Sequence, residues 1–230
     1  MMAHIDFQQY GHIVFDWNGT IVDDVDLALD CVNRLRIDLG LVAIDLPTYR
    51  ELFQFPISTF YRELGFDFNK TPFEELVLRY LRHFDLGVAD CRICHGFYDL
   101  ALYLKSRRIP ISILSATQQA TLERAVHCKE VAPLVENLFG LADHIAANKM
   151  ERASELDRLI AASSSATILM IGDTDHDHEV ASRHGWDFVA IASGHQARSR
   201  LEKLNAPVFD DLAMLLPPTH STSRIPRHDT

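Results

Sequence analysis

The chain has 230 residues, 47% of them hydrophobic and 23% charged, and its formal net charge is −10. Such a length and composition are typical of a soluble globular protein with one sizeable core and a smaller appended unit, which excludes disorder as its general state. The acidic excess argues against nucleic acid or an anionic membrane as the main partner, because both bind basic surfaces.

The first ten residues contain no basic segment followed by a long apolar run, and no apolar run elsewhere reaches the length of a membrane span. We therefore expect a cytoplasmic monomer or homodimer with no membrane partner. Cys91 and Cys94 do not predict a zinc site, because no second ligand pair stands at the usual spacing. We expect all the cysteines to be reduced thiols packed as small apolar side chains.

The first predicted element is a buried strand that starts at Ile13 and ends abruptly in Asp16. An apolar strand rarely ends in a carboxylate without a reason, because charged groups are seldom buried. Gly19 and Thr20 follow closely in the sequence and indicate a loop. We therefore expect the strand to deliver the carboxylate into a functional loop.

Residues 24–92 show helical rather than strand periodicity. An amphipathic helix begins near Asp26 and stops at Gly40, with apolar residues at fourfold spacing between them. A second helix covers about 56–64, and a third starts at Thr71 with a capping box and a proline in its first turn. We predict that this stretch is an all-helical domain inserted into the rest of the chain.

Helices and strands alternate from Gly96 onward. The alternation predicts a doubly wound parallel sheet, an α/β core assembled from residues 1–23 and 93–216. The tail, 217–230, is rich in Pro, Ser, Thr and His, and we expect it to be disordered. The predicted helices are 96–108, 117–130, 151–162 and 179–184, and the predicted strands are 109–114, 144–147, 166–171 and 188–192.

Ligands of an open parallel sheet bind beyond the carboxyl ends of its strands, so the residues that follow the strands form the candidate site. Asp16 and Ser115 follow two of these strands, and Asp173 follows a third, with Asp177 four residues later. Clustered carboxylates of this kind suit Mg²⁺, a hard cation that prefers oxygen ligands. Solvated positions are expected for Asp175, His176 and His178.

Two of these segments carry a family resemblance. The run from Asp16 to Thr20 resembles Asp-x-Asp-Gly-Thr, and the run from Gly172 to Asp177 resembles Gly-Asp-x-x-x-Asp, which are the first and fourth motifs of the haloacid dehalogenase superfamily. The likeness extends from about Gly11 to Leu215 and is greatest to the phosphoglycolate phosphatase-like branch. It implies a Rossmann-like core, a helical cap inserted between the first and second motifs, and Mg²⁺-dependent hydrolysis of a small phosphorylated metabolite.

The resemblance also implies catalytic roles. Asp16 would be the nucleophile that forms an aspartyl phosphate. Asp16 and Asp173 would bind Mg²⁺ directly, together with the main-chain carbonyl of Asn18. Asp177 would act through water. Lys149 resembles the third motif, and would hold phosphate and offset the charge of the carboxylates.

The remaining expected contacts concern the phosphoryl group and the substrate. Ser115 resembles the second motif, a hydroxyl that hydrogen-bonds the transferred group, and Thr117 is the alternative, although we expect Thr117 to cap the next helix. Arg50, Gln54 and Arg62 of the inserted helices are expected to contact substrate. The expected phosphate-binding set is Asn18, Gly19, Thr20, Ser115, Ala116, Lys149 and Arg50.

Asn18 departs from the family pattern, in which the second Asp of the first motif is the general acid and base. A carboxamide does not titrate, and general acid–base help is typically worth about 10²- to 10⁴-fold in rate. A substrate with a good leaving group, such as an acyl or aryl phosphate, hardly needs that help. Other proton donors remain open, among them His83, His95 and His195.

Three alternative functions are weighed against the phosphatase. Asn18 alone favours a catalytically weakened phosphate-binding or regulatory module, although such a module would not need Asp16, Asp173 and Asp177 together. A phosphonatase would need a cap lysine, and Lys70 is the one lysine in the inserted segment. A dehalogenase would need no metal, which the retained acidic residues argue against.

Overall fold

The centre of the protein is a parallel β-sheet. The computed structural model describes residues 5–142, 149–163 and 167–217. In this part of the chain the main sheet has six strands in the order β5-β4-β1-β6-β7-β8, and each neighbouring pair is parallel. The strands are β1 (His12–Phe15), β4 (Ile111–Gln118), β5 (Asn137–Leu141), β6 (Ile168–Gly172), β7 (Asp187–Ile191) and β8 (Val208–Phe209).

Strand β1 occupies the middle of the sheet, between β4 and β6. Ile13 pairs with Ile111 on one side and with Leu169 on the other. Successive side chains of a strand point to opposite faces, so Ile13 joins one apolar cluster and Val14 joins the other. A strand buried on both faces needs apolar residues throughout, which explains why β1 shows no polar alternation.

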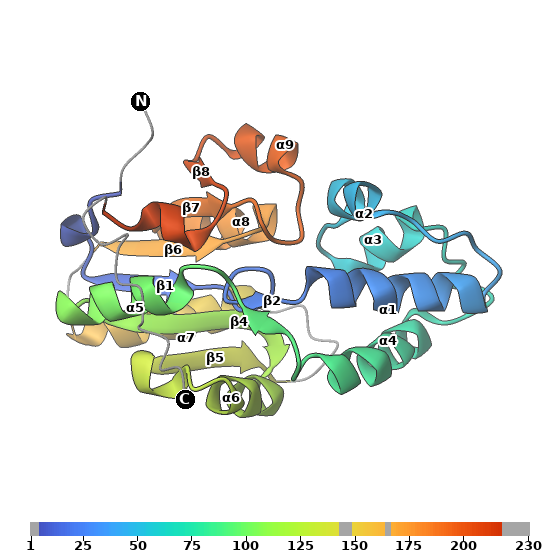
Figure 1. Ribbon diagram of the computed structural model, residues 1–230, viewed down its shortest axis with the longest axis horizontal. Coiled ribbons are helices and arrows are strands. Elements are labelled where there is room, and N and C mark those ends of the chain that lie inside the picture. The colour runs from blue at the N-terminus through green and yellow to red at the C-terminus, as the bar shows by residue number, and fades with distance from the viewer. Residues whose placement is uncertain (1–4, 143–148, 164–166, 218–230) are drawn as a thin grey trace, which may run out of the picture.

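Helices cover both faces of the sheet (Figure 1). Helices α5 (Phe97–Ser106) and α6 (Gln119–Cys128) contribute buried side chains to one cluster, and α7 (Lys149–Ser163) and α8 (Asp175–His184) contribute to the other. The predicted doubly wound α/β architecture is confirmed. The short helices of this part of the fold are α9 (Arg198–Leu201) and the 3-10 turns Phe7–Gln9, Ala132–Leu134, Glu202–Leu204 and Leu212–Leu215.

A group of helices lies beyond the carboxyl ends of the strands (Figure 1). It consists of α1 (Val25–Asp38), α2 (Leu46–Leu52), α3 (Ile57–Glu63) and α4 (Phe73–Gly87), which share an apolar cluster of their own. The chain enters it through β2 (Val22–Asp23) and leaves through β3 (Arg92–Ile93), which pair as an antiparallel ribbon. We refer to α1–α4 as the helical unit.

A helix that crosses a membrane must be both long and apolar. None of the helices of the described residues combines the necessary length with the necessary apolar character.

Several elements differ from those expected from the sequence. Strand β5 was not predicted, and the strand expected at 144–147 lies outside the described residues. Thr117 does not cap α6, because it belongs to β4 and the side chain of Gln118 caps the helix instead. The capping box expected at Thr71 is absent, because Pro72 is the N-cap residue of α4 and has no side-chain donor or acceptor. Helix α2 was also not predicted, and the expected disordered tail lies, apart from Pro217, outside the described residues.

Candidate active site

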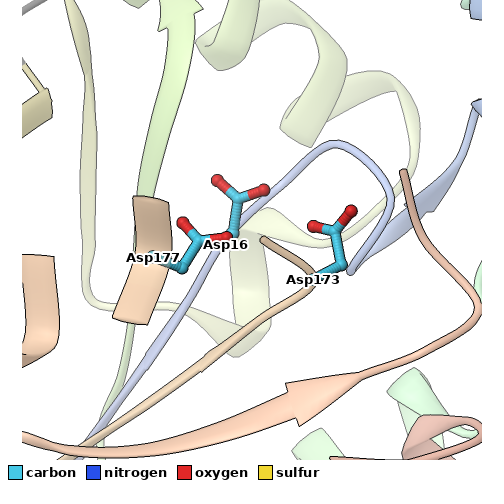
Figure 2. Close-up of side chains that lie close together, drawn as sticks. All are labelled: Asp16, Asp173 and Asp177. Carbon is cyan, nitrogen blue, oxygen red and sulfur yellow. The ribbon is translucent and has the colours of Figure 1, made fainter. Parts of the chain in front are cut away.

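Three buried carboxylates meet where the central strands end. Asp16 follows β1, Asp173 follows β6, and Asp177 lies in the first turn of α8. Figure 2 shows their side chains pointing into a common space from these separate segments. One oxygen of each carboxylate lies within 4.8 Å of the corresponding oxygens of the other two. The strand order therefore brings together residues that lie far apart in the sequence.

Local hydrogen bonds fix the orientation of Asp177. Thr174 is the N-cap residue of α8, and its hydroxyl accepts a hydrogen bond from the Asp177 amide (3.3 Å). In return, Oδ2 of Asp177 accepts hydrogen bonds from the Thr174 amide (3.1 Å) and hydroxyl (2.7 Å). This reciprocal capping box occupies one carboxylate oxygen and leaves Oδ1 facing the cluster.

Lys149 is the positive charge of the cluster. It begins α7, its side chain is 4% exposed, and its ammonium group donates to Oδ1 of Asp16 and to Oδ1 of Asp177, the latter at 2.6 Å. Burial by itself lowers the pKa of Lys149, but the two carboxylates outweigh burial and raise it above its usual range. The lysine therefore stays charged, which the expected phosphate contact requires.

One ammonium group does not balance three carboxylates. Burial, together with the nearby Asp177 and Asp173, raises the pKa of Asp16 to about 8 despite its contact with Lys149. Burial also raises the pKa of Asp173 to about 6. For Asp177, Lys149 and the capping hydrogen bonds outweigh burial and lower the pKa. A buried cluster with too little positive charge, built from hard oxygen donors, fits a divalent cation such as Mg²⁺.

This charge imbalance predicts a pH-dependent stability in the absence of metal. Asp16 binds a proton more tightly in the folded than in the unfolded chain, so the free energy of unfolding should fall as pH rises from 6.5 to 8. His195, whose pKa is raised to about 9, acts in the same direction over this window. Below pH 6.5 the buried His12, with a pKa lowered to about 4, acts in the opposite direction.

The measurement is chemical denaturation in chelator at several pH values. Asp16→Asn should reduce the slope between pH 6.5 and 8, because the titrating carboxyl is then absent. Added Mg²⁺ should also reduce it. A slope that is unchanged in Asp16→Asn would contradict the assignment of the raised pKa to this carboxyl.

The Gly19-Thr20 pair allows the first loop to approach Asp173. The Thr20 hydroxyl donates to Oδ1 of Asp173 (2.9 Å), and the backbone amide of His195 donates to Oδ2 (2.6 Å). Gly19 has φ +74°, and a Cβ there would lie 2.4 Å from Oδ2 of Asp173. Any side chain at this position would therefore displace the carboxylate.

Asn18 is held by two polar side chains. Its Nδ2 donates to Oδ2 of Asp24 (2.7 Å), and its Oδ1 accepts from the hydroxyl of Thr117 (2.7 Å). Asp24 is 1% exposed and also accepts a hydrogen bond from the amide of Gly19 (2.8 Å). The amide of Asn18 is the group that can both donate to Asp24 and accept from Thr117, so the exchange at position 18 is matched to its surroundings.

His195 connects the helical unit to the acid cluster. Its Nδ1 lies 2.9 Å from the hydroxyl of Tyr49, and its Nε2 lies 3.4 Å from Oδ1 of Asp24. Burial alone would lower its pKa, but Asp24 and the other carboxylates raise it to about 9. The sequence indicates a position near the site for His195, but the role of Asp24 was missed, because its place just before a helix suggests a cap.

Other expected site residues lie elsewhere or have different partners. The guanidinium of Arg50 donates to the carbonyl oxygens of Ser193 (2.7 Å) and Gly194 (2.9 Å), and that of Arg62 lies 5.0 Å from the ring centre of Phe68. These contacts hold the fold together and give no support to substrate binding by either arginine. His83 contacts Arg34, and the exposed His95 contacts Asp211.

The second-motif residues also have defined positions. Ser115 is buried, and its oxygen accepts a hydrogen bond from the amide of Thr117 (3.0 Å). Ala116 and Thr117 line a cavity of about 580 Å³ that also reaches Asp16 and Lys149. The role of Ser115 remains a prediction, and Thr117 is the hydroxyl that faces the cavity. His176 was expected to be solvated but is half-buried against the ring of Phe55, with ring centres 4.7 Å apart.

Among the described residues the acid cluster is the one group of side chains with metal-binding geometry. The thiols of Cys91 and Cys94 form no disulfide, and neither belongs to a cluster of this kind. Asp175, another expected surface residue, is partly buried and pairs with Arg200 at 2.7 Å. Its contacts with the 196–200 segment stabilise the start of α8 and do not point to a metal-ligand role.

The parallel sheet, the helices inserted after its first strand and the carboxylates at its edge define a class of hydrolase. The chain belongs to the haloacid dehalogenase-like hydrolases, whose family model matches residues 13–191. A phosphoglycolate phosphatase from Synechococcus elongatus is 26% identical over 195 residues, which cover 82% of this chain and 87% of that protein.

Solved structures share the same fold. A haloacid dehalogenase-like family protein from Streptococcus pneumoniae has a TM-score of 0.73 and 19% identity, covering 87% of this chain and 93% of that one. A predicted phosphatase from Clostridium acetobutylicum has a TM-score of 0.75 and 15% identity, covering 90% and 96%. At these identities the likeness establishes the architecture.

Proposed function

We propose that this protein is a Mg²⁺-dependent phosphatase that hydrolyses a small phosphorylated organic molecule through an aspartyl phosphate. The observation that carries the proposal is the contact of Lys149 with both Asp16 and Asp177 beside a cavity that Asp16 and Lys149 line. Family membership and the phosphoglycolate phosphatase relative support the same reaction class. A site that only bound phosphate would have no need for three buried carboxylates.

The chemistry follows from the position of Asp16. One carboxylate oxygen forms a bond to phosphorus while the bond from phosphorus to the ester oxygen breaks. The electron pair leaves with the organic oxygen, which takes a proton from water. Water then attacks the same phosphorus, the bond to Asp16 breaks, and inorganic phosphate and the free carboxylate form. The proton lost by the attacking water balances the one that the organic oxygen gained.

The metal and the lysine would both stabilise negative charge at the phosphoryl group. Mg²⁺, held by the carboxylates of Asp16 and Asp173 and the carbonyl of Asn18, would neutralise charge on the phosphoryl oxygens. The ammonium group of Lys149 orients Asp16 and offers a hydrogen-bond donor to the phosphoryl group. Asp177 holds the lysine in place. Asn18 keeps its backbone role but supplies no proton.

The proposal is tested by phosphate release from a panel of phosphorylated compounds in the presence of Mg²⁺. We expect turnover that disappears on addition of chelator and returns with excess Mg²⁺. The absence of metal-dependent turnover across a broad panel would reject the proposal.

The exchange at Asn18 supports a second candidate, a phosphate-binding or regulatory module with little turnover. Rapid mixing separates the two candidates, because a burst of phosphoenzyme followed by steady hydrolysis excludes the module. A phosphonatase gains no support, since the side chain of Lys70 is 84% exposed and pairs with Asp67. Lys149 is thus the one lysine among the described residues that line the cavity.

Restoring the family residue should disturb the native site. In Asn18→Asp a carboxylate replaces the amide that donates to Asp24 at 2.7 Å, so one of the two carboxyls must take up a proton. We expect the free energy of unfolding at pH 8 to fall by about 1 to 3 kcal/mol, the usual cost of losing a buried hydrogen-bond donor. Adding Asp24→Asn should restore most of that loss.

The double variant also tests the leaving-group requirement. With a carboxyl at position 18 and a neutral amide at 24, alkyl phosphate hydrolysis should rise relative to aryl phosphate hydrolysis by about 10²-fold. The measurement is kcat/KM for both substrates in the parent and the double variant. Equal changes for both would indicate that the native protein already has another proton donor.

A further inference from the structure

The cavity over the acid cluster extends into the helical unit. Asp16 and Lys149 lie at its core end, and α4 supplies the other end. Its volume is about 580 Å³, within the size range of sites for ring-bearing small molecules. A two-carbon phosphorylated acid would leave most of this space to water.

The far walls of the cavity are aromatic and aliphatic. The residues that form them are Phe73, Tyr80, Leu81 and Phe84 of α4. Phe53 and Phe55 also line the cavity but lie nearer the acid cluster, with ring centres 4.9 Å from His195 and 4.7 Å from His176. Apart from Phe53 these side chains are only half-buried, although their neighbours form the closed core of the helical unit. An apolar ligand that displaces water from half-buried apolar side chains binds with a favourable free energy.

The cavity offers little to a second negative charge. Among its described lining residues Lys149 is the one lysine or arginine, and its ammonium already contacts two carboxylates. Both ring nitrogens of His195 lie close to partners, at Asp24 and Tyr49. A carboxylate on the organic part of a substrate would therefore lack a cation to pair with, which is costly in a partly desolvated site.

Acidic side chains strengthen this discrimination. Asp24, Asp85 and Glu179 also line the cavity. Asp24 is 1% exposed, so its weakly screened charge would repel an anionic organic group at close range. Asp85 and Glu179 are exposed, and Glu179 pairs with Arg183 at 2.7 Å, so solvent and this partner screen their charges. The nearest expected cationic contact, Arg50, instead donates to backbone carbonyls outside the cavity wall.

We propose that the substrate is a phosphate monoester of an uncharged aromatic alcohol, with the ring in the aromatic end of the cavity and the phosphate at Asp16 and Lys149. This inference rests on the proposed phosphatase function and narrows its substrate class. When its oxygen is bonded directly to the ring, as in a phenol, such an alcohol is also a good leaving group, which suits a site where Asn18 supplies no proton. Phosphoglycolate carries a carboxylate in addition to its phosphate, so it is the wrong class of substrate for this cavity.

The first test compares substrates. We expect kcat/KM for 2-naphthyl phosphate to exceed that for 2-phosphoglycolate by at least about 100-fold, and we expect acetyl phosphate, a small substrate with a good leaving group, to show turnover. A preference for 2-phosphoglycolate would overturn the inference while leaving the phosphatase intact.

The second test changes the cavity wall. Leu81→Gln should raise KM for 2-naphthyl phosphate by about 10-fold or more and change kcat/KM for acetyl phosphate by a much smaller factor. Leu78→Gln is the matched control, because Leu78 lies on the same helix but is 51% exposed and does not line the cavity. Val77→Phe fills the cavity and should exclude the naphthyl group in the same way. If neither wall variant separates the two substrates, the ring does not bind there.

Binding without turnover separates the inference from the function. In calorimetry with Mg²⁺ present, benzylphosphonate should bind more tightly than phosphonoacetate, which has a carboxylate in place of the ring. Tighter binding of benzylphosphonate without turnover of any phosphate would support the ligand class and reject the phosphatase. Tighter binding of phosphonoacetate would overturn the ligand class.

Discussion

Asp16→Asn is expected to lower turnover by at least about 10⁴-fold, in line with the loss of a nucleophile in other enzymes that use covalent catalysis. The amide cannot attack phosphorus, and no other carboxylate of the cluster takes its place. Asp177 is held by Lys149 and by the capping box of α8, and Asp173 accepts hydrogen bonds from Thr20 and from the amide of His195. The protein should stay folded. A neutral side chain also relieves the charge imbalance of the cluster, so metal-free stability at pH 8 should be equal or higher.

Asp23→Asn is the matched control for this variant. Asp23 is exposed and lies close to Asp16 in the sequence, in strand β2 of the β2–β3 ribbon. Steady-state phosphate release and thermal unfolding should both be unchanged in the control. Retention of most activity by Asp16→Asn would reject the aspartyl-phosphate mechanism, whatever the metal requirement.

Much of the core could be predicted from its two strand-to-carboxylate transitions. The runs before Asp16 and Asp173 are apolar and short, and such runs form central strands of a parallel sheet because both faces are buried. Adjacent parallel strands end at the same edge, so the meeting of these two carboxylates follows from pattern and topology together. The confirmed fold class depends on these local signals, which are strong at β1 and β6.

Strand β5 could not be predicted because its own residues favour a turn. It contains Asn137 and Gly140, which sequence rules treat as strand breakers. The structure gives a different reason for the glycine, since a Cβ at Gly140 would lie 2.6 Å from the carbonyl oxygen of Thr117. Close approach to the neighbouring strand, β4, depends on the tertiary structure, and no local sequence pattern indicates it.

In the site, too, local sequence patterns could predict some contacts but not those that depend on the tertiary structure. Asp24 directly precedes α1, so its sequence context suggests a cap, yet its side chain makes no cap hydrogen bond and instead contacts Asn18 and Gly19. One signal was available, because an Asn in place of the family's Asp implies a nearby acceptor for its amide. The partners of Arg50 depend on how the helical unit meets the 193–194 loop, which the sequence does not encode locally.

Lys149→Met is expected to cause the largest loss of stability. The side chain is 4% exposed and neutralises Asp16 and Asp177, so removing the ammonium leaves both carboxylates buried without their cation. Breaking a buried ion pair from one side typically costs about 3 to 5 kcal/mol. The loss should be greatest at pH 8 and smaller at pH 5, because the two carboxyls take up protons more readily once the lysine is absent.

Chemical denaturation in chelator at pH 8 and pH 5 measures this difference. Lys70→Met is the matched control, since Lys70 is 84% exposed and its one ion pair, with Asp67, spans 3.8 Å. Its free energy of unfolding should change by no more than about 0.5 kcal/mol at either pH. If Lys149→Met is as stable as the parent at pH 8, the carboxylates do not depend on this ammonium, and the charge balance derived for the cluster is wrong.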